Sequence, residues 1–396
     1  MREDWEYKTF GEIGSFLRGK NIQKADFVSG GLPCIHYGQI HTKFDISIDY
    51  HLSEIPQEVY DKAIIASPGD VIIAITSEDI DGSCKSVVWL GNYDIAVSAH
   101  AAILKHNMNG KFIAYYLRSN TFFTQKLKYA RGFKVMEIKT KDLAKLVLPI
   151  PPKPTQLSIV SELDKLNELI QIKKEQLKDY DALAQSIFYE MFGDPVENEK
   201  GWEVKKLGKL CSKIGSGATP RGGNESYKDE GISLIRSLNV YNNEFRRKDL
   251  AYIDDEQAAA LSNVTILEDD VLLNITGASV ARCCIVPSDL LPARVNQHVC
   301  IIRPLDNVLV PIFLNKVLTN ISYQIRLLTL ARSKGATREA LPKSVVDSLL
   351  VPLPPLSLQH SFAHKIEQIE RQKAGVQKTI TDLETLLAAR MQYWFD

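Results

Sequence analysis

The sequence repeats itself at a spacing of about 200 residues over most of its length. The segment WEYKTFGEI, which begins at Trp5, reappears from Trp202 as WEVKKLGKL, an offset of 197 residues. DVIIAIT from Asp70 matches DVLLNIT from Asp270 at an offset of 200, and LVLPIPP in the first half matches LLVPLPP in the second at 203. The blocks recur in the same order, and the offset changes only by small loop differences. The chain is therefore predicted to contain two similar halves.

Each half is predicted to be a globular α+β domain followed by one long helix. Short apolar strands alternate with turns rich in glycine and asparagine, and a proline-rich segment then stops the preceding element. The predicted boundaries are a first domain over residues 1–152, a first long helix over 153–193, a second domain over 194–355 and a second long helix over 356–396.

The two long helices share one apolar pattern. Apolar positions alternate steps of three and four residues, and adding 203 to the first series gives the second. Such a seam favours coiled-coil packing over a one-sided surface helix. We expect the helices to pack together as an antiparallel coiled coil that separates the two tandem domains, with pseudo-two-fold symmetry. The central seam positions are Leu163, Leu166, Ile170, Leu177, Ile187, Ile366, Ile369, Val376, Ile380, Leu383 and Leu387.

The charges sum to zero, with 48 basic and 48 acidic side chains, which excludes a histone-like protein that coats DNA. Their distribution is uneven. Residues 1–152 hold 18 basic and 17 acidic side chains, residues 201–355 hold 19 and 16, and residues 153–200 hold 6 and 10. The two globular halves are therefore slightly basic, whereas the first helix with its linker is acidic.

The sequence favours a cytoplasmic protein. No apolar run approaches the ~18 residues of a membrane span, and the opening residues MREDWEYKTF lack the apolar core of a secretory signal. The six cysteines show no CxxC spacing, so we expect them to be reduced and mostly buried.

No motif for catalysis or cofactor binding emerges. The sequence has no GxxxxGK[ST], no GxGxxG after a strand and no HExxH. His360 and His364 lie one helical turn apart, but no third metal ligand accompanies them. His100 and His298 recur in both halves and are expected to be structural. The chain is therefore predicted to be a binding module without catalytic, metal or cofactor sites of its own.

Basic residues cluster in loops at corresponding places in the two halves. Glycine, hydroxyl and amide residues accompany them, and loops of this composition can contact phosphates and base edges. The candidate DNA-binding residues are Arg18, Lys20, Lys24, Lys126, Lys128, Arg131, Lys134, Ser216, Thr219, Arg221, Asn224, Arg246, Arg247, Lys248, Arg332, Lys334 and Arg338.

With these features in view, the sequence resembles the specificity subunits of type I restriction-modification systems over its full length. The resemblance rests on the repeated segments PIPPKPTQLSIVSELDKL and PLPPLSLQHSFAHKIEQI and on the boundary MFGDPVENEKGWEVKKLG. It rests also on DVIIAIT and DVLLNIT and on the aligned glycines Gly132 and Gly335. The acidic residue that commonly precedes the glutamine of the proline segment is replaced by Thr155 in the first repeat and by Leu358 in the second.

The resemblance implies a non-catalytic subunit that recognises double-stranded DNA. Each domain would read one half of a bipartite target, and the helices would set the spacer and dock DNA methyltransferase subunits, two of them, which motor-nuclease restriction subunits would join. S-adenosylmethionine, ATP and Mg²⁺ would then bind only in those partner subunits. Two alternatives remain open from the residues alone. They are a coiled-coil scaffold for protein interactions and a self-contained enzyme with tandem domains.

Overall fold

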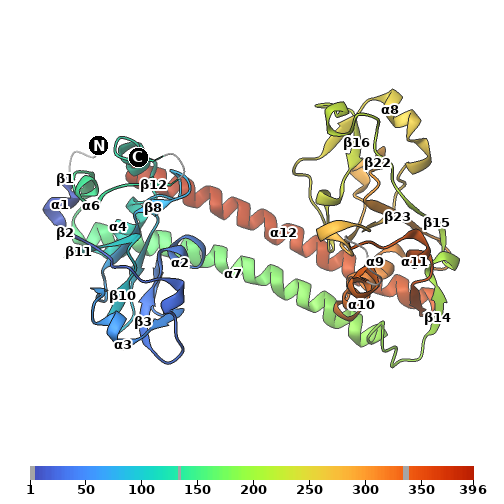
Figure 1. Ribbon diagram of the computed structural model, residues 1–396, viewed down its shortest axis with the longest axis horizontal. Coiled ribbons are helices and arrows are strands. Elements are labelled where there is room, and N and C mark those ends of the chain that lie inside the picture. Colours follow the sequence, from blue (N-terminus) through green and yellow to red (C-terminus); the bar gives the residue numbers. More distant parts are fainter. Residues whose placement is uncertain (1–4, 133–134, 333–338) are drawn as a thin grey trace. The chain divides into compact units, whose positions relative to one another are not determined.

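The computed structural model describes residues 5–132, 135–332 and 339–396, without the side chain of Asn224. The chain divides into two units (Figure 1). The first comprises Met1–Lys174 and Lys378–Asp396, and the second comprises Glu175–Gln377. Each unit thus contains one globular domain and a part of each long helix, α7 (Lys153–Phe192) and α12 (Leu356–Phe395).

The first unit is built from short strands and short helices. Its strands are β1 Glu6–Thr9, β2 Gly14–Arg18, β3 Leu32–Ile35, β4 Ser47–Ile48, β5 Ser53–Ile55, β6 Ile64–Ala66, β7 Val71–Ala74, β8 Thr76–Ser77, β9 Ser86–Trp89, β10 Ile95–Val97, β11 Ala101–His106, β12 Met136–Glu137 and β13 Val147–Ile150. Its short helices are α1 Phe10–Ile13, α2 Tyr37–Thr42, α3 Gln57–Tyr60, α4 Gly110–Tyr116, α5 Asn120–Lys126 and α6 Thr140–Leu143.

The second unit has the same kind of construction. Its strands are β14 Glu203–Lys206, β15 Cys211–Ser216, β16 Ile232–Ile235, β17 Val240–Tyr241, β18 Glu244–Phe245, β19 Ala251–Ile253, β20 Val271–Asn274, β21 Cys283–Ile285, β22 Ala293–Val295, β23 Val299–Pro304 and β24 Leu350–Leu353. Its short helices are α8 Asp255–Ala260, α9 Pro311–Thr319, α10 Ile321–Arg332 and α11 Lys343–Asp347.

The two main sheets of the first unit correspond to those of the second over most of their strands. The order β2-β11-β7-β9 in the first unit matches β15-β23-β20-β21 in the second, and β5-β3-β10 matches β19-β16-β22. The pairs β3-β10 and β16-β22 are both parallel, and the pairs β3-β5 and β16-β19 are both antiparallel. The buried apolar strands Val71–Ala74 and Val271–Asn274 occupy the same place in the two sheets. The prediction of two similar α+β domains is confirmed.

The two long helices pack against each other within each unit, as predicted. In the first unit Lys174 Nζ lies 2.8 Å from Glu384 Oε1, and Arg390 on α12 is paired with Glu162 on α7. In the second unit Lys373 Nζ lies 2.7 Å from Asp181 Oδ1. Residue numbers rise along one helix as they fall along the other, so the helices run antiparallel.

The predicted seam residues lie between the helices or against the domains. Leu163, Leu166, Ile170 and Ile380 are buried in the first unit, where Leu383 and Leu387 are half-buried. Ile366, Ile369 and Val376 are buried in the second unit, where Leu177 and Ile187 are half-buried.

A buried glutamine fixes the start of each long helix to its domain. In the second unit Gln359 is fully buried; its Nε2 donates to the carbonyl of Pro354 (2.9 Å), and its Oε1 accepts from the amide of Val310 (2.9 Å), the N-cap of α9. Gln156 makes the corresponding bonds in the first unit, to the Pro151 carbonyl (2.8 Å) and from the Asn109 amide (3.5 Å). The proline segment and the glutamine thus orient the helix together.

Replacing Gln359 with methionine is expected to lower the free energy of unfolding of the second unit by ~1–3 kcal/mol. Methionine has a similar volume but leaves the amide of Val310 without its partner in a buried place, and an unsatisfied buried polar group has a cost of that size. Urea denaturation followed by circular dichroism measures the loss. Gln372→Met on the exposed face of α12 is the control; equal midpoints for the two variants would contradict this role for Gln359.

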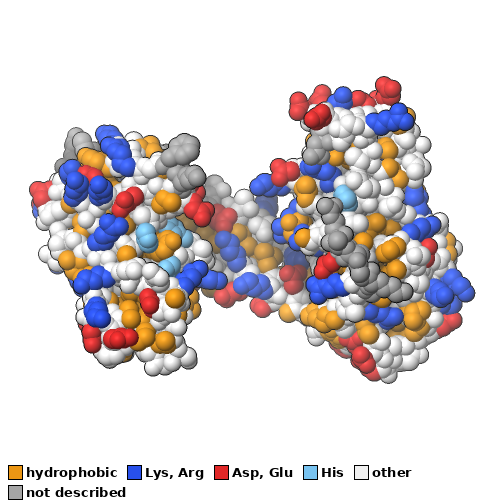
Figure 2. Space-filling view, viewed as in Figure 1, with side chains coloured by type: hydrophobic (Ala, Val, Ile, Leu, Met, Phe, Trp, Pro, Cys, Tyr) orange, Lys and Arg blue, Asp and Glu red, His pale blue; other side chains and the backbone are white. Residues whose placement is uncertain are grey.

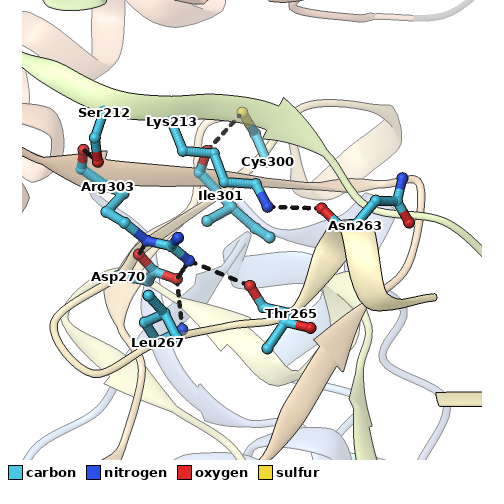
Figure 3. Close-up of polar contacts among 9 residues, drawn as sticks. All are labelled: Ser212, Lys213, Asn263, Thr265, Leu267, Asp270, Cys300, Ile301 and Arg303. Carbon is cyan, nitrogen blue, oxygen red and sulfur yellow. Dashed lines mark hydrogen bonds and ion pairs between the residues drawn. The ribbon is translucent and has the colours of Figure 1, made fainter. Parts of the chain in front are cut away.

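A buried aspartate pairs with a basic residue on the neighbouring strand in both sheets. Asp270 is fully buried, and Arg303 on β23 donates to both of its carboxylate oxygens at 2.7 Å (Figure 3). The amide of Leu267 also donates to Asp270 Oδ2 (2.8 Å). In the first unit Asp70 pairs with Lys105 on β11 in the same way. These pairs hold the entry to β7 and β20 against the next strand.

Candidate nucleic-acid interface

In the first unit, the end of β2 lies against the turn that precedes β11. Arg18 Nε donates to the carbonyl of Ala99 (3.2 Å), and Lys20 forms a bridge with Ser98 through the backbone. Gly19 permits this approach, because a Cβ at that position would lie 2.2 Å from the Ser98 carbonyl oxygen. The corresponding Gly217 in the second unit would place a Cβ 2.1 Å from the Val295 carbonyl oxygen. The residue after β2 and the residue after β15 must therefore both be glycine for the backbone to approach this closely.

The N-terminus of α2 joins the same surface. The amide of Tyr37 donates to Ser98 Oγ (2.9 Å), and the Tyr37 ring lies 4.6 Å from the His36 ring and 4.8 Å from the His100 ring. Burial lowers the pKa of His36, and the nearby charges of Lys24 and His100 lower it further. Figure 2 shows histidine side chains gathered on one face of this unit. His100 is exposed, and its packing against Tyr37 leaves its expected structural role a prediction.

The strand β12, with Ile138 after it, completes this surface. The strand β12 pairs with β8, and the amide of Ile138 donates to the Ile75 carbonyl (3.0 Å). Glu137 lies 3.2 Å from Arg18 Nη2 and bridges Arg131 through the backbone. Two basic clusters that are more than 100 residues apart in sequence therefore meet. We call this surface the first loop face and define it by Arg18, Lys20, Tyr37, His100 and Glu137.

The second unit carries an equivalent surface with different side chains. A chain of side-chain hydrogen bonds runs from Thr219 through Gln297 and His298 to Thr276. The Thr219 hydroxyl donates to Gln297 Oε1, Gln297 Nε2 lies 3.2 Å from His298 Nε2, and His298 Nδ1 lies 2.6 Å from Thr276 Oγ1. With Arg236, these four residues define the second loop face.

Matching backbone bonds hold the two loop faces in the same arrangement. The amide of Asn296 donates to the Ile235 carbonyl (3.0 Å), as that of Ser98 does to the Ile35 carbonyl (3.1 Å). His36 and Arg236 occupy the same position, each as the N-cap of a short helix, α2 or the 3₁₀ turn Ser237–Asn239. The fold thus presents different side chains from one shared scaffold.

The remaining predicted residues are distributed around these faces. Lys24, Lys128 and Arg131 are exposed in the first unit, and Ser216, Arg221 and Lys248 are exposed in the second. Three arginines are exposed but paired with carboxylates: Arg246 with Glu244, Arg247 with Asp289, and Arg332 with Glu339. Lys134, Lys334 and Arg338, with the aligned Gly335, lie outside the described residues, as does the side chain of Asn224.

Lys126 does not belong to this surface. It is 3% exposed, and its ammonium donates to the carbonyls of Asp81 (3.2 Å) and Ser83 (2.7 Å). Burial lowers its pKa. Because the ammonium is occupied by backbone acceptors inside the domain, we correct the prediction and leave Lys126 out of the interface.

Seven residues of the two loop faces were not among the candidates from the sequence. They are Tyr37, His100, Glu137, Arg236, Thr276, Gln297 and His298. The repeat offset contained the signal, since His36 and Arg236 are 200 residues apart and Gln297 stands next to the repeated His298. Within residues 5–132, 135–332 and 339–396, no group of three or more His, Cys, Asp or Glu side chains is arranged to hold a metal ion.

Comparison with known protein families identifies the chain. Residues 2–179 and residues 199–385 each match the type I restriction modification DNA specificity domain. The chain belongs to this family. It is a specificity subunit of the type I restriction-modification class, the non-catalytic subunit for recognition of the DNA target.

Relatives of the specificity subunit agree with this assignment over nearly the whole chain. The type I restriction enzyme EcoBI specificity subunit of Escherichia coli is 23% identical, over 96% of this chain and 82% of its own length. The S subunit from M. genitalium has the same fold, with a TM-score of 0.56, 13% identity and coverage of 99% and 96% of the two chains. A chain from a structural study of complex assembly in a type I R-M system gives a TM-score of 0.61, 18% identity and coverage of 100% and 98%. In the part of the specificity subunit that the structure describes, no helix is both long and apolar enough to cross a membrane.

Proposed function

We propose that each loop face reads one half of a bipartite target in double-stranded DNA. The observation that carries the proposal is the presence of different side chains at matching positions of one scaffold. Arg18 in the first unit corresponds to Ser216 in the second, His36 to Arg236, and Ala99 to Gln297. Because hydrogen-bonding side chains distinguish base edges in the major groove, two such faces suit a target with two different halves.

The basic residues around each face would hold the DNA backbone. Lysine and arginine contacts to phosphates fix register and supply affinity that does not depend on sequence. Lys20, Lys24 and Lys128 are exposed in the first unit, and Arg221 and Lys248 in the second. The zero net charge of the chain suits a reader that shares its phosphate contacts with partner subunits.

The pair of long helices would set the separation of the two half-sites and would bind the partner subunits. Two packed helices that carry one domain each would fix the distance between half-sites, and a pseudo-two-fold arrangement would present both loop faces to one duplex. Leu157, Leu169 and Ile172 on α7 are 44–60% exposed in the first unit. Exposed apolar side chains of this kind suit a protein interface, and we assign it to two DNA methyltransferase subunits, which motor-nuclease restriction subunits would join.

The cofactors of the reaction belong to the partner subunits in this proposal. S-adenosylmethionine would bind the methyltransferase subunits, and ATP and Mg²⁺ the motor-nuclease subunits. Methyl transfer would supply a methyl group from the cofactor to a base, and the specificity subunit would hold the DNA in place for that step.

Selection from random duplex DNA tests this proposal. The full chain, co-expressed with its methyltransferase subunits, is incubated with duplexes that carry a randomised segment, and bound DNA is sequenced over successive rounds. We expect enrichment of two short sequences at one fixed separation. Enrichment of no sequence, or of one continuous site, would contradict the proposal.

Substitution of two lysines separates backbone contacts from base reading in the same assay. Lys20→Ala with Lys24→Ala is expected to weaken binding to every sequence and to reduce the slope of log K against log salt by up to about 2, since each lost phosphate contact contributes about 0.9. The enriched sequence is expected to stay the same. The charge-matched control is Lys206→Ala with Lys209→Ala, two exposed lysines that lie outside both loop faces and both long helices.

A further inference from the structure

The two loop faces carry different side chains at the turn that precedes β11 in the first unit and β23 in the second. The residue before the repeated histidine is Ala99 in the first unit and Gln297 in the second. In the first unit the guanidinium of Arg18 lies over this turn. Resting on the proposed function, we propose that Gln297 reads an adenine in one half-site and that Arg18 reads a guanine in the other.

The side-chain amide of Gln297 is held in one orientation. Its Oε1 accepts from the Thr219 hydroxyl, and its Nε2 contacts His298 Nε2 at 3.2 Å. An amide nitrogen can only donate, so His298 Nε2 is the acceptor and the ring carries its proton on Nδ1, which donates to Thr276 Oγ1 at 2.6 Å. The hydroxyl and the imidazole together prevent the amide from turning over.

This arrangement leaves a defined reading edge. Gln297 is exposed, and after the two bonds above it retains one Nε2 hydrogen and one lone pair on Oε1. A neighbouring donor and acceptor match the N7 acceptor and N6 donor of adenine, the bidentate contact that glutamine makes in the major groove. Because Thr219 and His298 fix the amide beforehand, the loss of side-chain freedom on binding is reduced.

Arg18 offers a different edge from the corresponding place. Its Nε donates to the Ala99 carbonyl (3.2 Å) and its Nη2 lies 3.2 Å from Glu137 Oε1. Half of the side chain, 52%, remains exposed. Within the described part of the chain Nη1 has no protein partner, so its two hydrogens and the second Nη2 hydrogen are available. Parallel donors of this kind match the O6 and N7 acceptors of guanine.

The selection on random duplexes, run on full-chain variants with the methyltransferase subunits, tests the assignment. Gln297→Ala is expected to reduce the preference for adenine at a single position of one half-site by about 5- to 100-fold, the range for one bidentate base contact. Gln297→Glu is expected to change the preferred base at that position to cytosine, because a carboxylate accepts from cytosine N4. Arg18→Ala is expected to reduce the preference for guanine at a single position of the other half-site.

Two further variants separate reading from general damage. Thr219→Val removes the hydroxyl that orients Gln297, so the adenine preference should weaken at the same position without a change of preferred base. Gln372→Ala, at an exposed glutamine of α12 in the same unit, should leave every position unchanged.

The outcomes distinguish this inference from the proposed function. A wild-type profile with two half-sites, together with an unchanged profile for Gln297→Ala and Arg18→Ala, would overturn the base assignment and leave DNA recognition intact. Loss at several positions of both half-sites would also overturn it. A wild-type selection that enriches no sequence would contradict the proposed function and the inference with it.

Discussion

Replacing Asp270 with alanine is expected to lower the free energy of unfolding of the second unit by roughly 3 kcal/mol. The carboxylate is fully buried and accepts two hydrogen bonds from Arg303 and one from the Leu267 amide. Its removal leaves a guanidinium without its partner, and breaking a buried ion pair in this way costs ~3–5 kcal/mol. We expect the lower end, because the Arg303 side chain remains 24% exposed.

The same unit supplies a control ion pair in which an arginine also contacts both carboxylate oxygens of an aspartate, but in which both side chains are exposed. Arg247 Nη2 lies 2.9 Å and 2.8 Å from the two carboxylate oxygens of Asp289, but these side chains are 54% and 66% exposed. Asp289→Ala is therefore expected to cost at most ~1 kcal/mol, as exposed pairs do. Chemical denaturation of both variants measures the difference. Equal losses of free energy of unfolding would show that the contribution of the Asp270–Arg303 pair does not depend on its burial.

A double replacement tests whether the destabilisation arises from the charge that is left without a partner. Asp270→Leu with Arg303→Met removes both charges and fills the space with apolar side chains. Such replacements of buried pairs are often nearly neutral, so the double variant is expected to be more stable than Asp270→Ala. A double variant as unstable as the single one would mean that the pair provides more than mutual neutralisation.

The duplication and the helices were predictable from the sequence because their signals are periodic. A heptad seam and a repeat offset survive in any one sequence, and the strands Val71–Ala74 and Val271–Asn274 are continuous apolar runs. The ends of the helices were predicted to within one residue, but the packing of the end of α7 was less predictable. Phe188 and Phe192 are 2% exposed and contact Phe313 and Phe362, because the last turns of α7 pack on the second domain as well as on α12.

The loop faces were predictable only in part, because long-range strand pairing assembles them. Arg18 at the end of β2 pairs with Glu137 on β12, more than 100 residues further along the chain. No pattern near either residue in the sequence indicates this contact. Lys126 shows the opposite error: it belongs to a basic cluster in the sequence, but its place at the end of α5 directs its ammonium to the carbonyls of Asp81 and Ser83. The clusters of basic residues in the sequence therefore indicated which loops form the loop faces, but not which side chains lie on them.

Exchange of one domain tests the central claim, that the two loop faces read separate half-sites, more directly than any point variant. A chimaera in which residues 1–152 are replaced by the corresponding residues of a relative with a different target retains the second unit's Glu175–Gln377 and with it the whole second loop face. Each domain contains its own sheets and its own loop face, so we expect the exchange to act locally.

The measurement is a map of methylated bases in a host that expresses the chimaera with the methyltransferase subunits, compared with the map for the parent chain. We predict that one half-site is replaced by that of the relative, while the other half-site and the separation between them are unchanged. A map in which both half-sites change, or in which neither does, would contradict the account.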